Sequence, residues 1–169
     1  YPRVRLFLND SLVDERPAGY VQQFKAVFTL PYQAGTLRAV GVDENGIEQE
    51  TVVLKTSGTP VSLRLTTQDQ TIKADGQDLA FVIIEVVDKN GNVVPETSLP
   101  VKIECTGKGT VIAGGNAAYA DMESFRSLTP NTFRGKAIAI VQPDGEKGDI
   151  QVKVSAKGLE DASIVITAY

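Results

Sequence analysis

Apolar and polar residues alternate over short runs along most of this 169-residue chain, and no run has the 3.6-residue period of a helix. The clearest run is LAFVIIEVV, residues 79–87. As an extended strand it places on one face Ala80, Val82, Ile84 and Val86. Glu85 marks the opposite face as partly solvated, so we expect the first face to point into a core.

Ten further alternating runs predict strands, at residues 4–8, 24–28, 36–42, 51–55, 61–66, 101–105, 110–112, 136–141, 150–154 and 163–167. Turn-forming pairs lie between several of them, at Asn9-Asp10, Asn45-Gly46 and Asn90-Gly91. Because Asn and Gly both tolerate positive φ, we expect a two-residue hairpin turn at Asn90-Gly91. The pattern predicts an all-β protein.

Residues 57–60, Ser-Gly-Thr-Pro, have no apolar anchor and predict a boundary between two consecutive immunoglobulin-like β-sandwich modules, at residues 1–57 and 58–169. About seven short strands separated by turns are typical of such a sandwich, and the second module has them. Only four strands are predicted in the first. A domain of that size buries little of its surface, so we expect the first module to be truncated at its N-terminus, with residues 4–8 near an exposed edge.

The composition of the chain excludes several classes of catalytic, metal-binding and nucleic-acid-binding site. The chain has no histidine, which excludes Ser-His-Asp and Cys-His catalysis and most zinc sites. A net charge of -4 without a basic stripe argues against nucleic-acid binding, and no apolar run approaches the length of a membrane span. Cys105, the only cysteine, is expected to be a small buried side chain. We therefore predict no catalytic residue, no cofactor and no metal site.

Acidic residues leave two alternatives open. Asp75 with Asp78, and Asp121 with Glu123, could in principle reach the ~5–10 Å separations that glycosidases use. The alternative is that they form turns or are solvated charges. Residues 88–92, DKNGN, are similar to the start of a calcium loop but lack its later bidentate Glu, and a hairpin turn suffices to explain them.

Two stretches are candidates for contacts. Residues 114–134 show no clean alternation and exceed the usual loop length, so they are either functional or folded on themselves. The candidates there for glycan binding or interdomain contact are Asn116, Tyr119 and Arg134. On the outer face of the 79–87 strand, an apolar patch is predicted from Leu79, Phe81 and Ile83. We expect the first module, or protein upstream of it, to cover all or part of this patch.

Several runs also match a known pattern, in order, over nearly the whole chain: residues 4–9 (VRLFLN), 31–41 (PYQAGTLRAVG), 72–79 (IKADGQDL), 88–95 (DKNGNVVP), 123–125 (ESF) and 133–136 (FRGK). In these runs the chain resembles the C-terminal region of glycoside hydrolase family 2 enzymes, the β-galactosidase group. The second half also resembles bacterial invasin-type immunoglobulin-like domains. The chain departs from the family pattern at Asn9-Asp10, Asn116-Ala117-Ala118 and Phe133-Arg134-Gly135.

The resemblance implies a non-catalytic accessory region. In such enzymes an upstream (β/α)₈ barrel supplies two catalytic glutamates, and the parent would cleave terminal β-galactosides or related sugars in the periplasm or outside the cell. The partners would be the upstream domains of that parent, and the region would brace the barrel or subunit contacts. The alternative is a carbohydrate-binding or adhesin-like module with a glycan as its partner.

Overall fold

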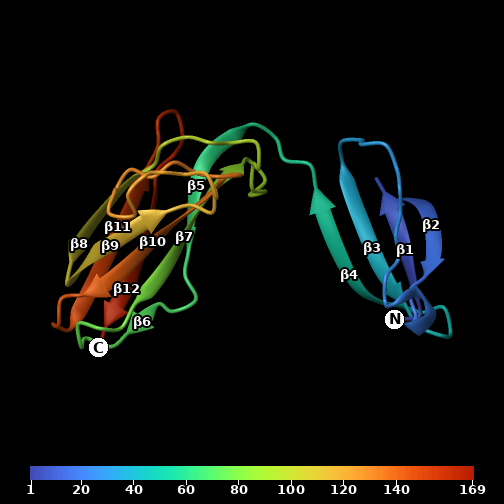
Figure 1. Ribbon diagram of the computed structural model, residues 1–169, viewed down its shortest axis with the longest axis horizontal. Coiled ribbons are helices and arrows are strands. Elements are labelled where there is room, and N and C mark those ends of the chain that lie inside the picture. The colour runs from blue at the N-terminus through green and yellow to red at the C-terminus, as the bar shows by residue number, and fades with distance from the viewer. The chain divides into compact units, whose positions relative to one another are not determined.

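The computed structural model describes all of residues 1–169 and consists of strands, turns and one short 3₁₀ helix, η1 (Tyr20–Gln22). The chain divides into two compact units, Tyr1–Thr56 and Ser57–Tyr169, coloured blue to teal and green to red in Figure 1. The predicted all-β class is confirmed.

The first unit is one antiparallel sheet, sheet A, with the strand order β2-β1-β3-β4. Its strands are β1 (Arg3–Leu8), β2 (Ser11–Pro17), β3 (Thr36–Val42) and β4 (Glu48–Lys55). Asn9 and Asp10 join β1 to β2 with positive φ at both residues (49° and 64°), the geometry of a type I′ hairpin turn. The sequence analysis missed β2, whose charged run has little apolar alternation. Residues 4–8, expected near an exposed edge, are therefore paired on both sides, and that prediction is wrong.

The second unit contains two four-stranded sheets. Sheet B has the order β5-β7-β10-β9, from β5 (Pro60–Thr66), β7 (Ala80–Asp88), β10 (Lys136–Pro143) and β9 (Gly109–Gly115). Sheet C has the order β6-β12-β11-β8, from β6 (Thr71–Ile72), β12 (Ala162–Ala168), β11 (Gly148–Ser155) and β8 (Lys102–Gly107). Only the short β6–β12 pair is parallel. The two sheets share one core and form an immunoglobulin-like sandwich (Figure 1).

The core of the sandwich is made by alternate residues of facing strands. On β7 the inward side chains are fully buried, as predicted: Ala80, Val82, Ile84 and Val86. Sheet C contributes Ile150, Val152 and Val154 from β11. Each large side chain of this kind stabilises the folded state by about 1.5–3 kcal/mol relative to exposure.

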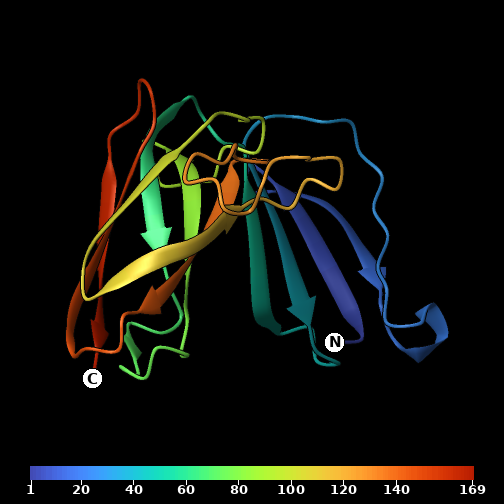
Figure 2. The same ribbon diagram turned by 60° about the vertical axis from the view of Figure 1, so that its left-hand side comes forward.

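The strand predicted at residues 24–28 does not form. Phe24 has a left-handed backbone (φ 59°) just after η1, and residues 25–33 pair with no strand. In Figures 1 and 2 this segment runs from one end of sheet A to the other as an irregular trace. The alternation is present, but a strand also needs a neighbour to complete its hydrogen-bond ladder.

The predicted two-residue turn at Asn90-Gly91 is wrong in its length. Asp88 N–H donates to the Asn92 carbonyl (2.9 Å), and Gly91 N–H donates to the Asp88 carbonyl (2.9 Å). The loop therefore has three residues, and only Gly91 has positive φ (77°). This is the hairpin in which a turn is followed by a left-handed residue.

Cys105 on β8 is half-buried rather than buried, and it packs against the edge of the core cluster. Its Sγ lies 3.5 Å from the Gly109 carbonyl oxygen, and burial raises the pKa of the thiol. A raised pKa lowers the fraction of reactive thiolate at neutral pH.

Candidate functional site

The long connection between β9 and β10 folds against an edge of the sandwich. Backbone hydrogen bonds attach it, among them those from the N–H groups of Gly114, Ile103 and Val101 to the carbonyl oxygens of Phe125, Leu128 and Pro130 (2.7, 2.8 and 3.0 Å). Gly114 belongs to sheet B and Ile103 to sheet C, so the loop is fixed to both sheets. It occupies strand edges that would otherwise be open to pairing with another chain.

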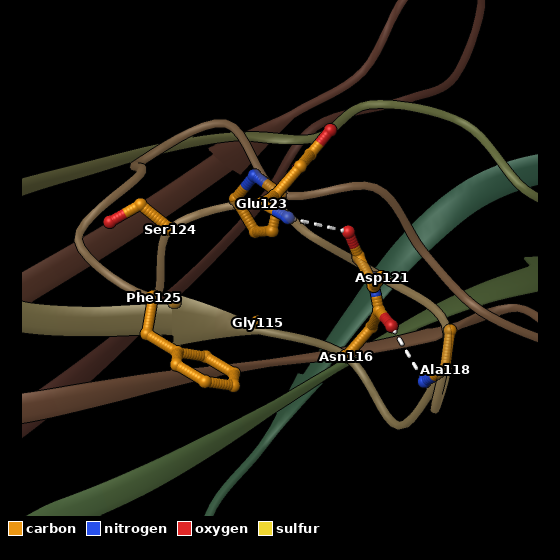
Figure 3. Close-up of a pocket in the computed structure, with 9 residues that line it drawn as sticks. Gly115, Asn116, Ala118, Asp121, Glu123, Ser124 and Phe125 are labelled. Carbon is orange, nitrogen blue, oxygen red and sulfur yellow. Dashed lines mark hydrogen bonds between the residues drawn. The ribbon is translucent and has the colours of Figure 1, made fainter.

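A small hollow lies inside this loop (Figure 3), with a volume of about 30 Å³. Its lining includes Gly115, Asn116, Asp121, Glu123 and Phe125. The volume suffices for about two water molecules, whereas pockets that enclose small ligands hold roughly 300–1,000 Å³. A sugar could bind this loop only on its outer surface.

Polar side chains in the hollow bind one another. Asn116 Nδ2 donates to Asp121 Oδ2 (2.5 Å) and to the Asn131 carbonyl (2.9 Å), and Asn116 Oδ1 accepts the Ala118 N–H (2.7 Å). Asp121 Oδ1 accepts the Glu123 N–H at 2.9 Å, as drawn in Figure 3. The Glu123 N–H and then the Asn116 amide lower the pKa of Asp121. The polar side chains of Asn116 and Asp121 therefore have hydrogen-bond partners within the loop itself.

The three predicted contact residues of the loop lie in different environments. Asn116 is engaged in the network of the hollow, Tyr119 is fully exposed, and the Arg134 guanidinium lies 5.5 Å from the ring centre of Phe133. No hydrogen bond, ion pair or ring contact joins the three. Sequence reasoning did not single out Met122, which is as exposed as Tyr119 at the same end of the loop.

The other acidic candidates form turns. Asp75 Oδ1 accepts the N–H groups of Gln77 and Asp78 (both 2.9 Å), which lower its pKa. Asp78 in turn accepts the N–H groups of Lys73 (2.8 Å) and Leu79 (3.0 Å). Both carboxylates are therefore engaged by neighbouring backbone.

The outer face of sheet B is apolar across two strands. Ile83 and Phe81 of β7 lie directly opposite Ile138 and Ile140 of β10. Phe81 is 47% exposed, and the three isoleucines are half-buried, as is Leu79 just before β7. Sequence reasoning found the β7 side chains but missed those of β10, because residues 136–141 are apolar on both faces and only the register identifies the outer one.

Glu85 borders this apolar face between two cations. Its carboxylate lies 2.8 Å from Arg64 Nη2 and 2.8 Å from Lys136 Nζ, on the neighbouring strands β5 and β10. Burial raises the pKa of Glu85, but the hydrogen bonds from Lys136 and Arg64 outweigh that effect and hold the pKa below its ordinary value. Glu85 itself is buried, whereas Phe81 on the same face is exposed, so the face is partly solvated as predicted.

The outer face of sheet C has the opposite character. It presents ion pairs between Lys102 and Glu104 (2.7 Å) and between Lys153 and Asp161 (2.9 Å). Its one exposed large apolar side chain is Val165, 49% exposed. The two faces of one sandwich therefore differ: sheet C has a solvated charged surface and sheet B a continuous apolar one.

Comparison with known proteins gives these surfaces a context. A family model described as "Glycoside hydrolase family 2 C-terminal domain 5" matches residues 63–165, most of the second unit. The chain belongs to this family. A second model, described as "Domain of unknown function (DUF4982)", matches residues 1–50. The resemblance stated from the sequence is confirmed.

Relatives of this glycoside hydrolase family 2 region come from longer proteins. "Beta-galactosidase BoGH2A" of Bacteroides ovatus is 30% identical over 137 residues, 81% of this chain and 16% of that protein. "Beta-glucuronidase" of Formosa agariphila is 28% identical over 168 residues, 96% of this chain and again 16% of that protein. A crystal structure of a glycosyl hydrolase family 2 member from Bacteroides cellulosilyticus is 31% identical, with a TM-score of 0.92 over 99% of this chain and 22% of that one.

The chain thus spans about a sixth of the curated relatives that it matches. In this glycoside hydrolase family 2 region, no helix has the length and apolar character needed to cross a membrane.

Proposed function

We propose that residues 1–169 form a non-catalytic C-terminal accessory region of a glycoside hydrolase family 2 enzyme, and that this region braces the catalytic barrel or subunit contacts. The parent would hydrolyse β-galactosides or related sugars, as the names of the relatives suggest. The carboxylates of Asp75, Asp78 and Asp121 are engaged in turns and loop contacts, and that of Glu85 in ion pairs, which favours a supporting role for the region.

One observation carries the bracing role: the contrast between the outer faces of sheets B and C. An apolar sheet face bordered by the Arg64–Glu85–Lys136 ion pairs is typical of an interface, whereas the charged face of sheet C is typical of a solvent surface. We propose that the upstream domains of the parent cover Phe81, Ile83 and the neighbouring isoleucines.

The test uses the whole protein that contains residues 1–169. Phe81→Asp introduces a charge on the proposed interface, and Val165→Asp introduces the same charge on the opposite sheet at nearly equal exposure (47% and 49%). We expect Phe81→Asp to lower the temperature at which the whole protein loses hydrolysis of a chromogenic β-galactoside, and Val165→Asp to leave it unchanged. Equal effects of the two variants would contradict the bracing role.

A glycan-binding role is the second candidate, and the full exposure of Tyr119 is the observation that favours it. An aromatic ring on an exposed loop can stack on a sugar face. Affinity electrophoresis of residues 1–169 in galactan gels would show retardation that is lost in Tyr119→Ala if this candidate is correct. A purely bracing region migrates identically with and without the polysaccharide.

We also propose that the parent is exported to the periplasm or secreted, as the family resemblance implies. Fractionation of cells that produce the whole protein tests this directly. Recovery of the protein with cytoplasmic markers would contradict it.

A further inference from the structure

A strand-like segment without a strand partner lies between η1 and β3. Along residues 25–30 exposed and half-buried side chains alternate, with Ala26, Phe28 and Leu30 half-buried and Lys25, Val27 and Thr29 exposed. No hydrogen bond within the protein engages the N–H groups of Ala26, Val27, Phe28, Thr29, Leu30, Tyr32 and Gln33. Such a run of unpaired donors in a segment with a two-residue period leaves backbone groups free to pair with a further strand.

Contacts with β2 place this segment over one particular face of sheet A. The Arg16 guanidinium lies 5.4 Å from the ring centre of Phe28, and Arg16 Nη1 donates to the Val27 carbonyl. Arg16 is opposite Val4 in the β1–β2 register, so the segment lies on the face that carries Val4. The segment already occupies the position of a second layer.

That face of sheet A, which we call the apolar face, is built from cross-strand rows. Leu6, Ala39 and Val52 form one row, and Leu8, Leu37 and Leu54 form the next. Leu6 is buried, but on the edge strand β4 Val52 is 60% exposed and Leu54 is 66% exposed. The apolar face is therefore covered near β1 and open near β4.

The opposite face of sheet A has its own side-chain cover. Glu15 pairs with Arg3 (3.0 Å) and Arg5 (2.6 Å), and Arg5 pairs with Glu48 (3.2 Å). The Arg38 guanidinium lies 4.0 Å from the ring centre of Phe7. These charged groups suit a solvated surface, so only the apolar face lacks a complete second layer.

We infer that residues 25–33 form a strand in the whole protein, paired with an extended segment of the same polypeptide outside residues 1–169. The two strands together close a second layer over the apolar face of sheet A, next to Val52 and Leu54. This inference shares one premise with the proposed function, namely that residues 1–169 are part of a longer protein.

The occupant is an extended peptide because only a strand supplies alternating N–H and C=O groups along such a segment. Its inward side chains are apolar, to match Val52 and Leu54. It comes from the same polypeptide because the chain spans only 16% of its curated relatives, and a tethered strand has a high effective concentration. A second copy of this chain is the competing occupant.

Hydrogen–deuterium exchange of residues 1–169 alone and of the whole protein tests the inference. We expect the amides of residues 26–30 to exchange about 100-fold or more slowly in the whole protein than in residues 1–169 alone. The tip of the 116–122 loop serves as the internal reference. Equal exchange in the two forms overturns the inference, as does protection of residues 26–30 in residues 1–169 alone that grows with protein concentration, which would identify a second copy.

Proline variants give an independent measurement. Neither Ala26 nor Val27 donates its N–H in the described chain, so Ala26→Pro and Val27→Pro are expected to change the Tm of residues 1–169 little. Successive N–H groups of a strand point to opposite sides, so one of the two variants removes a ladder bond in the whole protein and lowers its Tm more than the other. Equal Tm values for both variants in the whole protein contradict the pairing. Neither readout requires glycosidase activity, so the proposed function and this inference can fail separately.

Discussion

The carboxylate of Asp88 accepts a hydrogen bond from the backbone N–H of Gly58, 2.8 Å away and 30 residues earlier in the chain. The same carboxylate accepts the N–H groups of Asn90 (2.8 Å) and Asn92 (2.9 Å) and the Asn92 side-chain amide (3.1 Å). One buried side chain therefore fixes both the β7 hairpin loop and the first residues of the second unit. The pattern read as the start of a calcium loop is a structural anchor.

Replacing this anchor is expected to destabilise the second unit. Asp88→Asn keeps the shape of the side chain but turns one acceptor oxygen into a donor, which leaves at least one N–H group unpaired. We expect the Tm of the second unit to fall by roughly 5 °C in a calorimetric scan. Asp43→Asn changes the same kind of loop in the first unit, where Asp43 Oδ1 accepts the Asn45 and Ile47 N–H groups (both 2.9 Å), and should leave the second unit unchanged.

The stabilisation by Asp88 should depend on acidity. The Gly58 N–H, with further N–H groups from Asn92 and Asn90, lowers the pKa of Asp88 from 3.8 to about 2 against the effect of burial. As the pH falls the unfolded chain is protonated first, so the contribution is fully present above pH 3.8 and is lost as the pH falls toward 2. Urea unfolding of the wild type and Asp88→Asn should show a stability difference that shrinks within this window. If the difference in unfolding free energy between the two proteins stayed constant down to pH 2, the ionised Asp88 carboxylate would not be its cause.

Glu85 offers a test of partly buried charge pairing. Glu85→Gln leaves Arg64 and Lys136 facing a neutral amide, and we expect the free energy of unfolding to fall by about 1–2 kcal/mol, because the solvent exposure of both cations reduces the effect. Glu104→Gln removes an exposed pair with Lys102 on sheet C and should change stability little. Urea denaturation measures both. If the two variants lost the same unfolding free energy, the burial of Glu85 would not strengthen its ion pairs.

Two glycines with the same backbone conformation allow the cost of a left-handed backbone to be measured separately from the cost of a steric clash. Gly135 and Gly76 have φ of 74° and 71°, but a Cβ on Gly135 would lie 2.4 Å from the Val94 carbonyl oxygen, whereas a Cβ on Gly76 would meet nothing within 4 Å. We expect Gly76→Ala to cost about 1 kcal/mol from the left-handed backbone alone. Gly135→Ala should cost about 2 kcal/mol more, because the loop must shift away from Val94. If urea unfolding gave the same loss of unfolding free energy for both variants, the loop would move away from Val94 at no measurable cost, and the prediction would be wrong.

Several features of the fold are readable from the sequence because they are local. The period of two along residues 79–87 places Ala80, Val82, Ile84 and Val86 on one face, and all four are buried. Side chains alternate between the two faces of a strand because of the covalent geometry of an extended chain, so this alternation does not depend on a neighbouring strand. Turn positions are also set by local sequence. The length of the hairpin loop after β7, however, is set by the Asp88 side chain and by the single positive φ at Gly91.

What lies beside each strand is decided only in three dimensions. Residues 24–28 have the alternation of a strand and form none, because no strand of the chain pairs with them. Glu85 marks its face of β7 as partly solvated, yet Arg64 and Lys136 reach its carboxylate from two neighbouring strands and Glu85 itself is buried. Ile138 and Ile140 join Phe81 and Ile83 in one patch only through the β7–β10 register.

The sequence by itself thus determined the all-β class and the inward face of β7. The tertiary structure decided the sheet order, the apolar outer face of sheet B and the unpaired segment at residues 25–33. The reason is that side-chain alternation is set by neighbours along the chain, whereas pairing and burial depend on residues that are distant in sequence and close in space.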